Sequence, residues 1–272
     1  MISIACGLLH GPEHYVMHAL GRLWMADGRR VVWAKAYEAD AELGVLHIDK
    51  TRLEGADLPK PPPGVRVING QVLDISKRLF SVLEVFPDGD WDGPVIVKTN
   101  QNHFGLPEQS LASPPTGLAD RLRARLAQRS WRLAQRLPDR HYPVLSSLKK
   151  VPGWVWDDPG YIVERFMPER VDGLYALRGW MFLGSASYGW RLFSAEHMVK
   201  TASMVRFEYI DEPPPELWEL KARTGFDFGK FDYVIHDGKP VVLDLNKTPS
   251  LAGEGQSPRV RHLATGLMEF LK

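Results

Sequence analysis

Residues 230–250, KFDYVIHDGKPVVLDLNKTPS, contain two apolar runs separated by the tetrad His236-Asp237-Gly238-Lys239. An Asp-Gly pair between two such runs is typical of the tight turn of a β-hairpin. In a strand, residues two apart point to the same face, so Asp244 and Asn246 share one face and the neighbouring leucines share the other. The sequence therefore predicts a hairpin with a coherent polar face near its open end.

Two carboxylates and one amide oxygen converge on this polar face. Asp232 precedes the first strand, whereas Asp244 and Asn246 lie near the end of the second. Oxygen donors of this kind suit Mg²⁺ together with substrate phosphates. The alternative is a solvated hairpin whose Asp244 simply faces water. We favour the metal site because Lys247 continues the polar face beyond the strand.

The segment Asp244-Leu245-Asn246-Lys247-Thr248-Pro249 resembles the metal-binding strand of the ATP-grasp superfamily, in which an acidic residue, any residue and Asn hold magnesium ahead of a Pro-containing loop. Asp232 matches the earlier acidic ligand of that family. Lys230 falls where related carboxylate–amine ligases carry an Arg that contacts the transferred phosphoryl group or the acyl intermediate. The family more often has Glu at the position of Asp244, which implies a shorter reach to a second metal. The resemblance implies ATP and Mg as cofactors.

Two upstream lysines match positions that face the nucleotide in this family. Residues 93–100 read as a strand in which Lys98 reaches the phosphates, followed by a loop over residues 100–108 that folds over them. Gly105 is the only glycine of that loop, a departure from the family that puts phosphate binding by backbone alone in doubt. Lys77 lies in the segment that resembles the source of the other nucleotide-facing lysine. The alternatives are ordinary surface lysines.

Residues 161–168 resemble the hinge strand that binds adenine through backbone groups, with ribose contacts following it. The alternative is an ordinary core strand, and the position of this segment between Lys98 and Asp232 favours the hinge. The residues that the resemblance places against the nucleotide here are Glu164, Phe166, Met167 and, at the ribose, Glu169 or Asp172.

Three further cations lie where the superfamily neutralises phosphate or the substrate carboxylate. They are Arg178, Arg191 and Lys200. Lys200 is the best match to a phosphate-contacting lysine. Either Lys230 or Arg178, which precedes a predicted strand, would stabilise the oxyanion. The alternative for each is a solvated surface cation.

The opening of the chain predicts a βαβ unit, and later strands are separated by long loops rich in Gly and Pro. We expect a fold of the α/β and α+β classes: a pre-ATP-grasp α/β domain over 1–75, an ATP-grasp lid subdomain with a basic helical insertion over 76–163, and an ATP-grasp C-terminal subdomain over 164–272. The predicted strands are 2–6, 31–33, 44–48, 65–68, 94–98, 161–166, 180–187, 233–235 and 241–245, and the predicted helices are 13–26, 117–140 and 262–271.

Composition excludes several classes of protein. Of the 272 residues, 44% are hydrophobic and 25% charged, with 34 Lys and Arg against 33 Asp and Glu, so neither disorder nor a strongly charged partner is indicated. The single cysteine, Cys6, excludes an intrachain disulfide framework and fits a cytoplasmic location. No apolar stretch approaches the ~20 residues that cross a bilayer, so no membrane association is expected. His10, His14 and His18 recur at helical spacing, but a polar helix face is a better interpretation than a zinc site.

The predicted helix over residues 117–140 carries seven arginines. Residues 105–150 contain nine Lys and Arg against three Asp and Glu, a balance of +6, so the rest of the chain carries −5 to give the total of +1. The arginines from Arg121 to Arg140 could dock an acidic partner such as a peptide, or they could form a solvated face. Nucleic acid is not expected, because Trp131 is the only aromatic residue among these arginines.

The resemblance implies an ATP-dependent ligase that activates a substrate carboxylate as an acyl phosphate for attack by an amine or a thiol. The substrates would be small molecules or peptides that carry the carboxylate and the amine. One alternative is a phosphotransferase of the same fold that acts on a hydroxyl, since the metal and nucleotide residues would be the same. The other is a nucleotide-binding protein without turnover, which the glycine-poor loop motivates. The sequence leaves the oligomeric state open, with a homodimer among the options.

Overall fold

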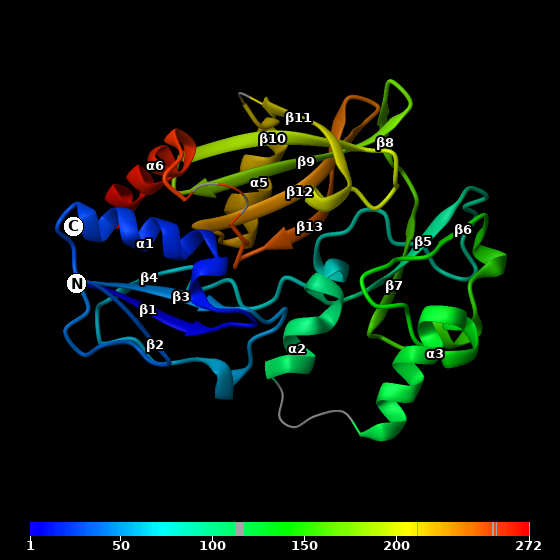
Figure 1. Cartoon of the computed structure of the whole chain (residues 1–272), viewed down its shortest axis with the longest axis horizontal. Helices are drawn as coiled ribbons and strands as arrows, with labels where there is room; N and C mark the ends of the chain where they lie inside the picture. The colour runs from blue at the N-terminus through cyan, green and yellow to red at the C-terminus, as the bar shows by residue number, and fades with distance from the viewer. Residues whose placement is uncertain (112–116, 211, 252, 254, 272) are drawn as a thin grey trace.

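Three β-sheets organise the residues described by the computed structural model, which are 1–111, 117–210, 212–251, 253 and 255–271 (Figure 1). The chain is a mixed α/β protein, as the sequence predicts. No helix in this part of the chain is both long and apolar enough to cross a membrane.

The first sheet has the order β2-β1-β3-β4 and is parallel throughout. Its strands are β1 (Ile2–Gly7), β2 (Val31–Ala34), β3 (Leu43–Ile48) and β4 (Arg66–Ile68). The helix α1 (Val16–Ala26) connects β1 to β2 after a short 3-10 turn at Pro12–His14. The apolar runs of β1 and β3 are almost fully buried, as expected for parallel strands covered on both faces. The predicted βαβ opening is confirmed.

The largest sheet has six strands in the order β11-β10-β9-β12-β13, with β8 paired to β9. The bounds are β8 (Glu169–Val171), β9 (Leu174–Leu183), β10 (Ala186–Ser194), β11 (Met204–Ile210), β12 (Phe228–His236) and β13 (Lys239–Asn246). The helices α5 (Pro215–Thr224) and α6 (Pro258–Thr265) accompany this sheet, and a 3-10 turn over Gly266–Glu269 follows α6.

The prediction of one strand over residues 180–187 is wrong. This segment contains the end of β9, the turn Gly184-Ser185 and the start of β10, which pair as an antiparallel hairpin. Gly184 has a φ of +57°, a backbone conformation that glycine adopts at little cost. The pair Gly184-Ser185 interrupts the apolar run at the turn, and the sequence prediction included it in the strand. The sequence also predicted no strand over residues 204–210, where β11 lies.

The third sheet has the order β6-β5-β7 and its own hydrophobic core. Its strands are β5 (Val95–Thr99), β6 (Val144–Leu145) and β7 (Tyr161–Arg165), and its helices are α2 (Leu106–Leu111), α3 (Leu118–Ala134) and α4 (Gly153–Asp157). The arginine-rich helix is shorter than predicted, because Gln135 ends α3 in the left-handed conformation. Leu122 and Leu126 on α3 are exposed rather than packed on the core.

A shared core joins the first sheet to the six-stranded sheet. Its members include Ile4 of β1, Leu20 of α1, Met181 of β9, Phe228 of β12 and Leu263 of α6. The opposite face of the six-stranded sheet packs on α5 through a second core that contains Trp180, Phe182 and Phe231. The two faces of the six-stranded sheet therefore have different neighbours.

The side chain of Asn69, just after β4, connects the first sheet to the six-stranded sheet by hydrogen bonds. Its amide nitrogen donates to the carbonyl oxygen of Phe228 at 2.8 Å, and its oxygen accepts from the backbone N–H groups of Asp227 and Phe228, each at 3.0 Å. Asn69 is 1% exposed and adopts a positive φ of 59°, so its three hydrogen bonds are made out of contact with bulk water.

Candidate active site

The predicted hairpin is confirmed and is longer than expected, since it comprises all of β12 and β13. In its register Asp232 lies opposite Asp244, and Lys230 lies opposite Asn246. Residues that face each other across an antiparallel pair point to the same side of the sheet. The four polar side chains therefore gather at one end of the hairpin and on one face, as the two-residue period predicts.

Asp232 and Asp244 line a pocket between the six-stranded and three-stranded sheets. Its apolar wall includes residues from both sheets and from the segment after β7. The charged residues are two lysines and two aspartates together with Glu164 and Arg165. The lining residues from the predicted site are Lys77, Lys98, Glu164, Phe166, Met167, Asp232 and Asp244. Seven of the thirteen predicted site residues thus meet at one pocket, although they come from distant parts of the sequence.

Lys77 is buried at this pocket, with 2% of its surface exposed. Its ammonium group lies 3.3 Å from Oδ1 of Asp244 and donates to the backbone carbonyl of Gln101 at 2.9 Å. Burial lowers the pKa of Lys77, but nearby Asp244, Tyr142 and Glu164 outweigh it, so the pKa lies above its ordinary value. Lys77 is therefore a fixed, protonated cation beside Asp244.

Lys98 and Glu164 form a second buried ion pair at the pocket. Ile96 pairs with Glu164 and Lys98 with Ile162, so Lys98 and Glu164 are diagonal neighbours on one face of β5 and β7. The Nζ of Lys98 lies 2.6 Å from Oε2 of Glu164, and the two side chains are 9% and 1% exposed. The pair holds the lysine head at the pocket wall.

Asp232 and Asn246 complete the set of oxygen donors. Lys230 lies 2.8 Å from Oδ2 of Asp232. Burial raises the pKa of Asp232 above its ordinary value, and the attraction to Lys230 offsets only part of this effect. The side-chain oxygen of Asn246 accepts from the backbone N–H of Thr248 at 2.9 Å, which fixes its orientation. Two carboxylates and an amide oxygen are the donor chemistry that Mg²⁺ prefers, so the residues fit this metal. Within the described residues, no group of three His, Cys, Asp or Glu side chains is placed to hold a metal.

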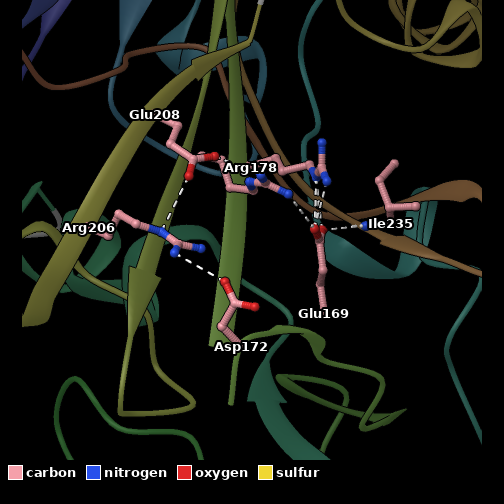
Figure 2. Close-up of polar contacts among 7 residues, drawn as sticks. Glu169, Asp172, Arg178, Arg206, Glu208 and Ile235 are labelled. Atoms are coloured by element: carbon pink, nitrogen blue, oxygen red, sulfur yellow. Dashed lines mark hydrogen bonds and ion pairs between the residues drawn. The ribbon is translucent and has the colours of Figure 1, made fainter. Parts of the chain in front are cut away.

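Arg178 and Glu169 lie on the opposite face of the six-stranded sheet from Asp232. Asp232 is paired with Gly179, so the preceding residue of β9 points to the other side. There Arg178 donates two hydrogen bonds of 2.7 and 2.8 Å to the carboxylate of Glu169, which also accepts from the backbone N–H of Ile235 at 2.8 Å (Figure 2). The structure does not bring these two residues to the pocket.

Burial raises the pKa of Glu169, but the hydrogen bonds from Arg178 and from the N–H of Ile235 outweigh it and leave the pKa below its ordinary value. Glu169 is therefore a negatively charged centre of an ion-pair network. Arg191 also lies within 3.5 Å of its Oε1.

Asp172 and Lys200 also lie outside the lining of the pocket. Asp172 occupies the turn between β8 and β9 with a φ of 53°, and its carboxylate lies 3.2 Å from Arg206 (Figure 2). Lys200 is exposed and donates to the backbone carbonyl of Arg140 at 2.8 Å. Its ammonium group lies 5.7 Å from the centre of the Phe104 ring.

Several pocket residues carry no signal in the sequence. Tyr142, Tyr175, His197 and Met198 line the pocket, and each lies in or beside a loop or at a strand end. Tyr142 is buried and shares a hydrogen bond of 3.0 Å with the hydroxyl of Thr99. Only the three-dimensional arrangement of the sheets could have revealed these residues.

A second pocket, of about 420 Å³, lies between the end of the first sheet and the residues that follow β5. It is lined by Lys50, Arg52, Gln101 and Glu108 among others. Oε1 of Glu108 accepts from the backbone N–H of Thr51 at 2.6 Å. Because Lys77 at the first pocket donates to the carbonyl of Gln101, one hydrogen bond connects the linings of the two pockets.

Comparison with known proteins identifies the fold. No protein-family model matches the chain, and no curated protein matches it at a significant level. Among solved structures, the chain resembles a RimK domain protein ATP-grasp from Sphaerobacter thermophilus DSM 20745, with a TM-score of 0.53, 13% identity, and coverage of 99% of this chain and 98% of that chain.

Two further solved structures are similar over their whole length. Macrocyclase MdnC bound with precursor peptide MdnA, from Microcystis aeruginosa MRC, has a TM-score of 0.53 and 10% identity, with 99% of each chain covered. The ATP-grasp ligase PsnB complexed with minimal precursor has a TM-score of 0.51 and 11% identity, with 99% of this chain and 98% of that chain covered. These similarities, which extend over nearly the whole chain, show that it has the fold of ATP-grasp proteins.

Proposed function

We propose that this protein is an ATP-dependent ligase that activates a substrate carboxylate as an acyl phosphate, which an amine or a thiol then attacks. The observation that carries the proposal is the meeting of Lys77, Lys98, Asp232 and Asp244 at one pocket. The two lysines can bind the phosphates of a nucleotide, and the two carboxylates can bind the divalent cation that accompanies it. No side-chain nucleophile is needed for this chemistry.

The nucleotide base would lie against the segment after β7. Phe166 and Met167 line the pocket there, and the N–H of Phe166 already donates to the carbonyl of Pro94 at 2.9 Å. Apolar walls with a few backbone groups are typical of sites for a flat aromatic ligand. Lys98 and Lys77 would then face the phosphates, each held in place by an acidic partner.

Asp232, Asp244 and Asn246 would hold Mg²⁺, which neutralises phosphate charge when bound. Lys230 contacts Asp232 at 2.8 Å and is the residue we place beside the transferred group. We leave Arg178 and Glu169 out of the site because they lie on the far face of the sheet. Asp172 and Lys200 are also left out, because neither lines the pocket and their polar partners, Arg206 and the carbonyl of Arg140, do not line it either, whereas Lys230 contacts the lining residue Asp232.

The domain division we propose is the one expected from the sequence, with boundaries near residues 75 and 163. The acceptor substrates would enter through the second pocket, since Gln101 of its lining receives the hydrogen bond from Lys77. Peptides are one class of acceptor we propose. MdnC and PsnB were solved with precursor peptides, and the exposed arginines and leucines of α3 offer a surface for an acidic, partly apolar segment.

An ADP-release screen across amino acids, peptides and sugar acids tests this function. With an active acceptor in hand, we expect Asp244→Asn to lower ADP formation by at least ~100-fold while circular dichroism stays unchanged, because the carboxylate is lost but the shape is kept. Asp237→Asn is the matched control, since Asp237 lies in the hairpin turn with its side chain 91% exposed.

The products separate the competing functions. Free phosphate together with a new amide or thioester identifies a ligase. A stable phosphoester would instead identify a phosphotransferase, and nucleotide binding without multiple turnovers on any acceptor would identify a binding protein. Undiminished turnover of Asp244→Asn would rule out the metal site as we assign it.

A further inference from the structure

The strand β11 leaves one edge of the six-stranded sheet open. It pairs with β10 on one side, and among the described residues no strand pairs with its other side (Figure 1). Val205, Phe207 and Tyr209 alternate along β11 and are 63%, 41% and 50% exposed. Edge strands of monomeric proteins are protected from pairing with another chain by charged side chains, especially lysine, by proline or by bulges. β11 contains neither lysine nor proline, and its pairing with β10 is irregular only at its first residues, where Phe193 pairs with Arg206 and Ser194 with Met204.

The sequence of β11 is self-complementary about Phe207. It reads Met204-Val205-Arg206-Phe207-Glu208-Tyr209-Ile210. When a second copy runs antiparallel with Phe207 opposite Phe207, each apolar residue faces an apolar residue and Arg206 faces Glu208 twice. Opposite charges and aromatic or β-branched residues are the favourable cross-strand pairs.

The other two-fold registers of this strand are unfavourable. An axis through Arg206 places two arginines opposite each other, and an axis through Glu208 does the same with two glutamates. Like charges directly opposite each other destabilise a strand pair. Axes nearer either end leave half of the strand unpaired. The charges of β11 therefore select the register centred on Phe207.

The structure already orients both charged side chains. Arg206 and Glu208 lie 3.3 Å apart, Glu208 also lies 2.6 Å from Arg191, and Arg206 lies 3.2 Å from Asp172 (Figure 2). The side chains of Arg206 and Glu208 nevertheless remain 38% and 39% exposed, so each can still meet a partner. On the other face, the ring centroids of Phe207 and Tyr209 lie 4.6 Å apart in an edge-to-face arrangement, and the guanidinium group of Arg259 lies over the Tyr209 ring.

We propose that two copies of this chain form a homodimer in which their β11 strands pair antiparallel about Phe207. The two six-stranded sheets become one continuous sheet, and Val205, Phe207 and Tyr209 of each copy cover those of the other. A closed two-fold interface of this kind uses the same patch on both subunits. The proposal is independent of the chemistry at the pocket.

Sedimentation velocity of the full-length protein over a range of about 1 to 100 μM tests the proposal, because dimer formation follows mass action. We expect a dimer for the unaltered chain. Phe207→Lys places two ammonium groups opposite each other at the axis and should weaken the dimer by at least ~30-fold, the loss typical of a central aromatic anchor. The matched control is Leu133→Lys on α3, an exposed apolar residue (78%) far from β11, which should leave the dimer intact.

A disulfide experiment tests the register. In a Cys6→Ser background, Phe207→Cys should form an interchain disulfide on mild oxidation, because directly opposite residues have Cα atoms ~5 Å apart, within the range of a disulfide. Val205→Cys should not, because the two copies of residue 205 lie four residues apart along the strand, or ~14 Å. Monomeric unaltered protein at 100 μM, a dimer unaffected by Phe207→Lys, or equal cross-linking of both cysteine variants would each overturn the proposal. A protein that stays monomeric at 100 μM and binds extended peptides at β11 would also overturn the proposal.

Discussion

The ion pair between Lys98 and Glu164 makes the most demanding prediction of the structure. Their charged atoms lie 2.6 Å apart, and the side chains are 9% and 1% exposed. At an effective dielectric constant of 20, two unit charges at this distance attract by about 6 kcal/mol. Burying each ion costs several kcal/mol, so the pair as a whole contributes little net stability. Removing one partner, however, leaves the other charge buried without the attraction that offsets its burial cost.

Lys98→Met should therefore lower the free energy of unfolding by about 3 to 5 kcal/mol, because the nearly inaccessible Glu164 carboxylate loses its counter-charge. The double variant Lys98→Met with Glu164→Gln should recover most of this loss and lie within about 2 kcal/mol of the unaltered protein. If Lys98 faces the phosphates as we propose, both variants should also bind ATP weakly, because both lack this lysine. Stability and nucleotide binding are thereby separated.

Urea unfolding followed by tryptophan fluorescence gives the comparison, since Trp154 and Trp156 pack against the core that includes Val97 and Val163 beside the pair. Lys149→Met, at an exposed lysine, is the control. The reasoning would be refuted by a Lys98→Met protein within about 1 kcal/mol of the unaltered chain, or by a double variant no more stable than Lys98→Met.

Two further predictions concern stability. Gly266→Ala should lower the melting temperature by several degrees, because a Cβ there would collide with the carbonyl oxygen of Leu183 and cost about 1 to 3 kcal/mol. The control is Gly153→Ala, which should have little effect because its Cβ would meet open space. Equal melting temperatures of the two variants would contradict the prediction. Glu169→Gln should cost about 3 kcal/mol at neutral pH. Folding lowers the pKa of Glu169, so its ionised carboxylate stabilises the folded protein at pH values above the ordinary carboxyl pKa, and this stabilisation is lost as the pH falls through the folded pKa. The free energies of urea unfolding of Glu169→Gln and the unaltered protein should therefore converge in acid. A difference that stays constant with pH would contradict the ionised state we assign to Glu169.

Local patterns were sufficient to predict the hairpin of β12 and β13. The Asp-Gly turn and the two-residue period placed Asp232 and Asp244 on one face, and the register agrees. These signals are short-range, so they do not depend on the rest of the fold. The parallel opening sheet was predictable for the same reason, since its strands are continuous apolar runs separated by an amphipathic helix.

The placement of Arg178 could not be predicted in this way. Which face of β9 it occupies depends on the pairing of Gly179 with Asp232, a contact between residues more than fifty positions apart. The same holds for Lys200, whose position is set by a hydrogen bond to Arg140. The strand β11 was missed although its sequence carries the signal, since Val205, Phe207 and Tyr209 alternate with Arg206 and Glu208 as in a strand with one apolar face.

The shared core of the first and six-stranded sheets constrains the order in which parts of this protein can fold during synthesis. It brings together Ile4, Leu20 and Leu263, so the strands made first by the ribosome are completed by a helix made near the end. Until α6 has left the ribosome, part of the apolar surface of the first sheet remains exposed to water. The core of the three-stranded sheet lies between residues 95 and 163 and needs no such delay. We therefore expect the middle of the nascent chain to fold before either of its ends.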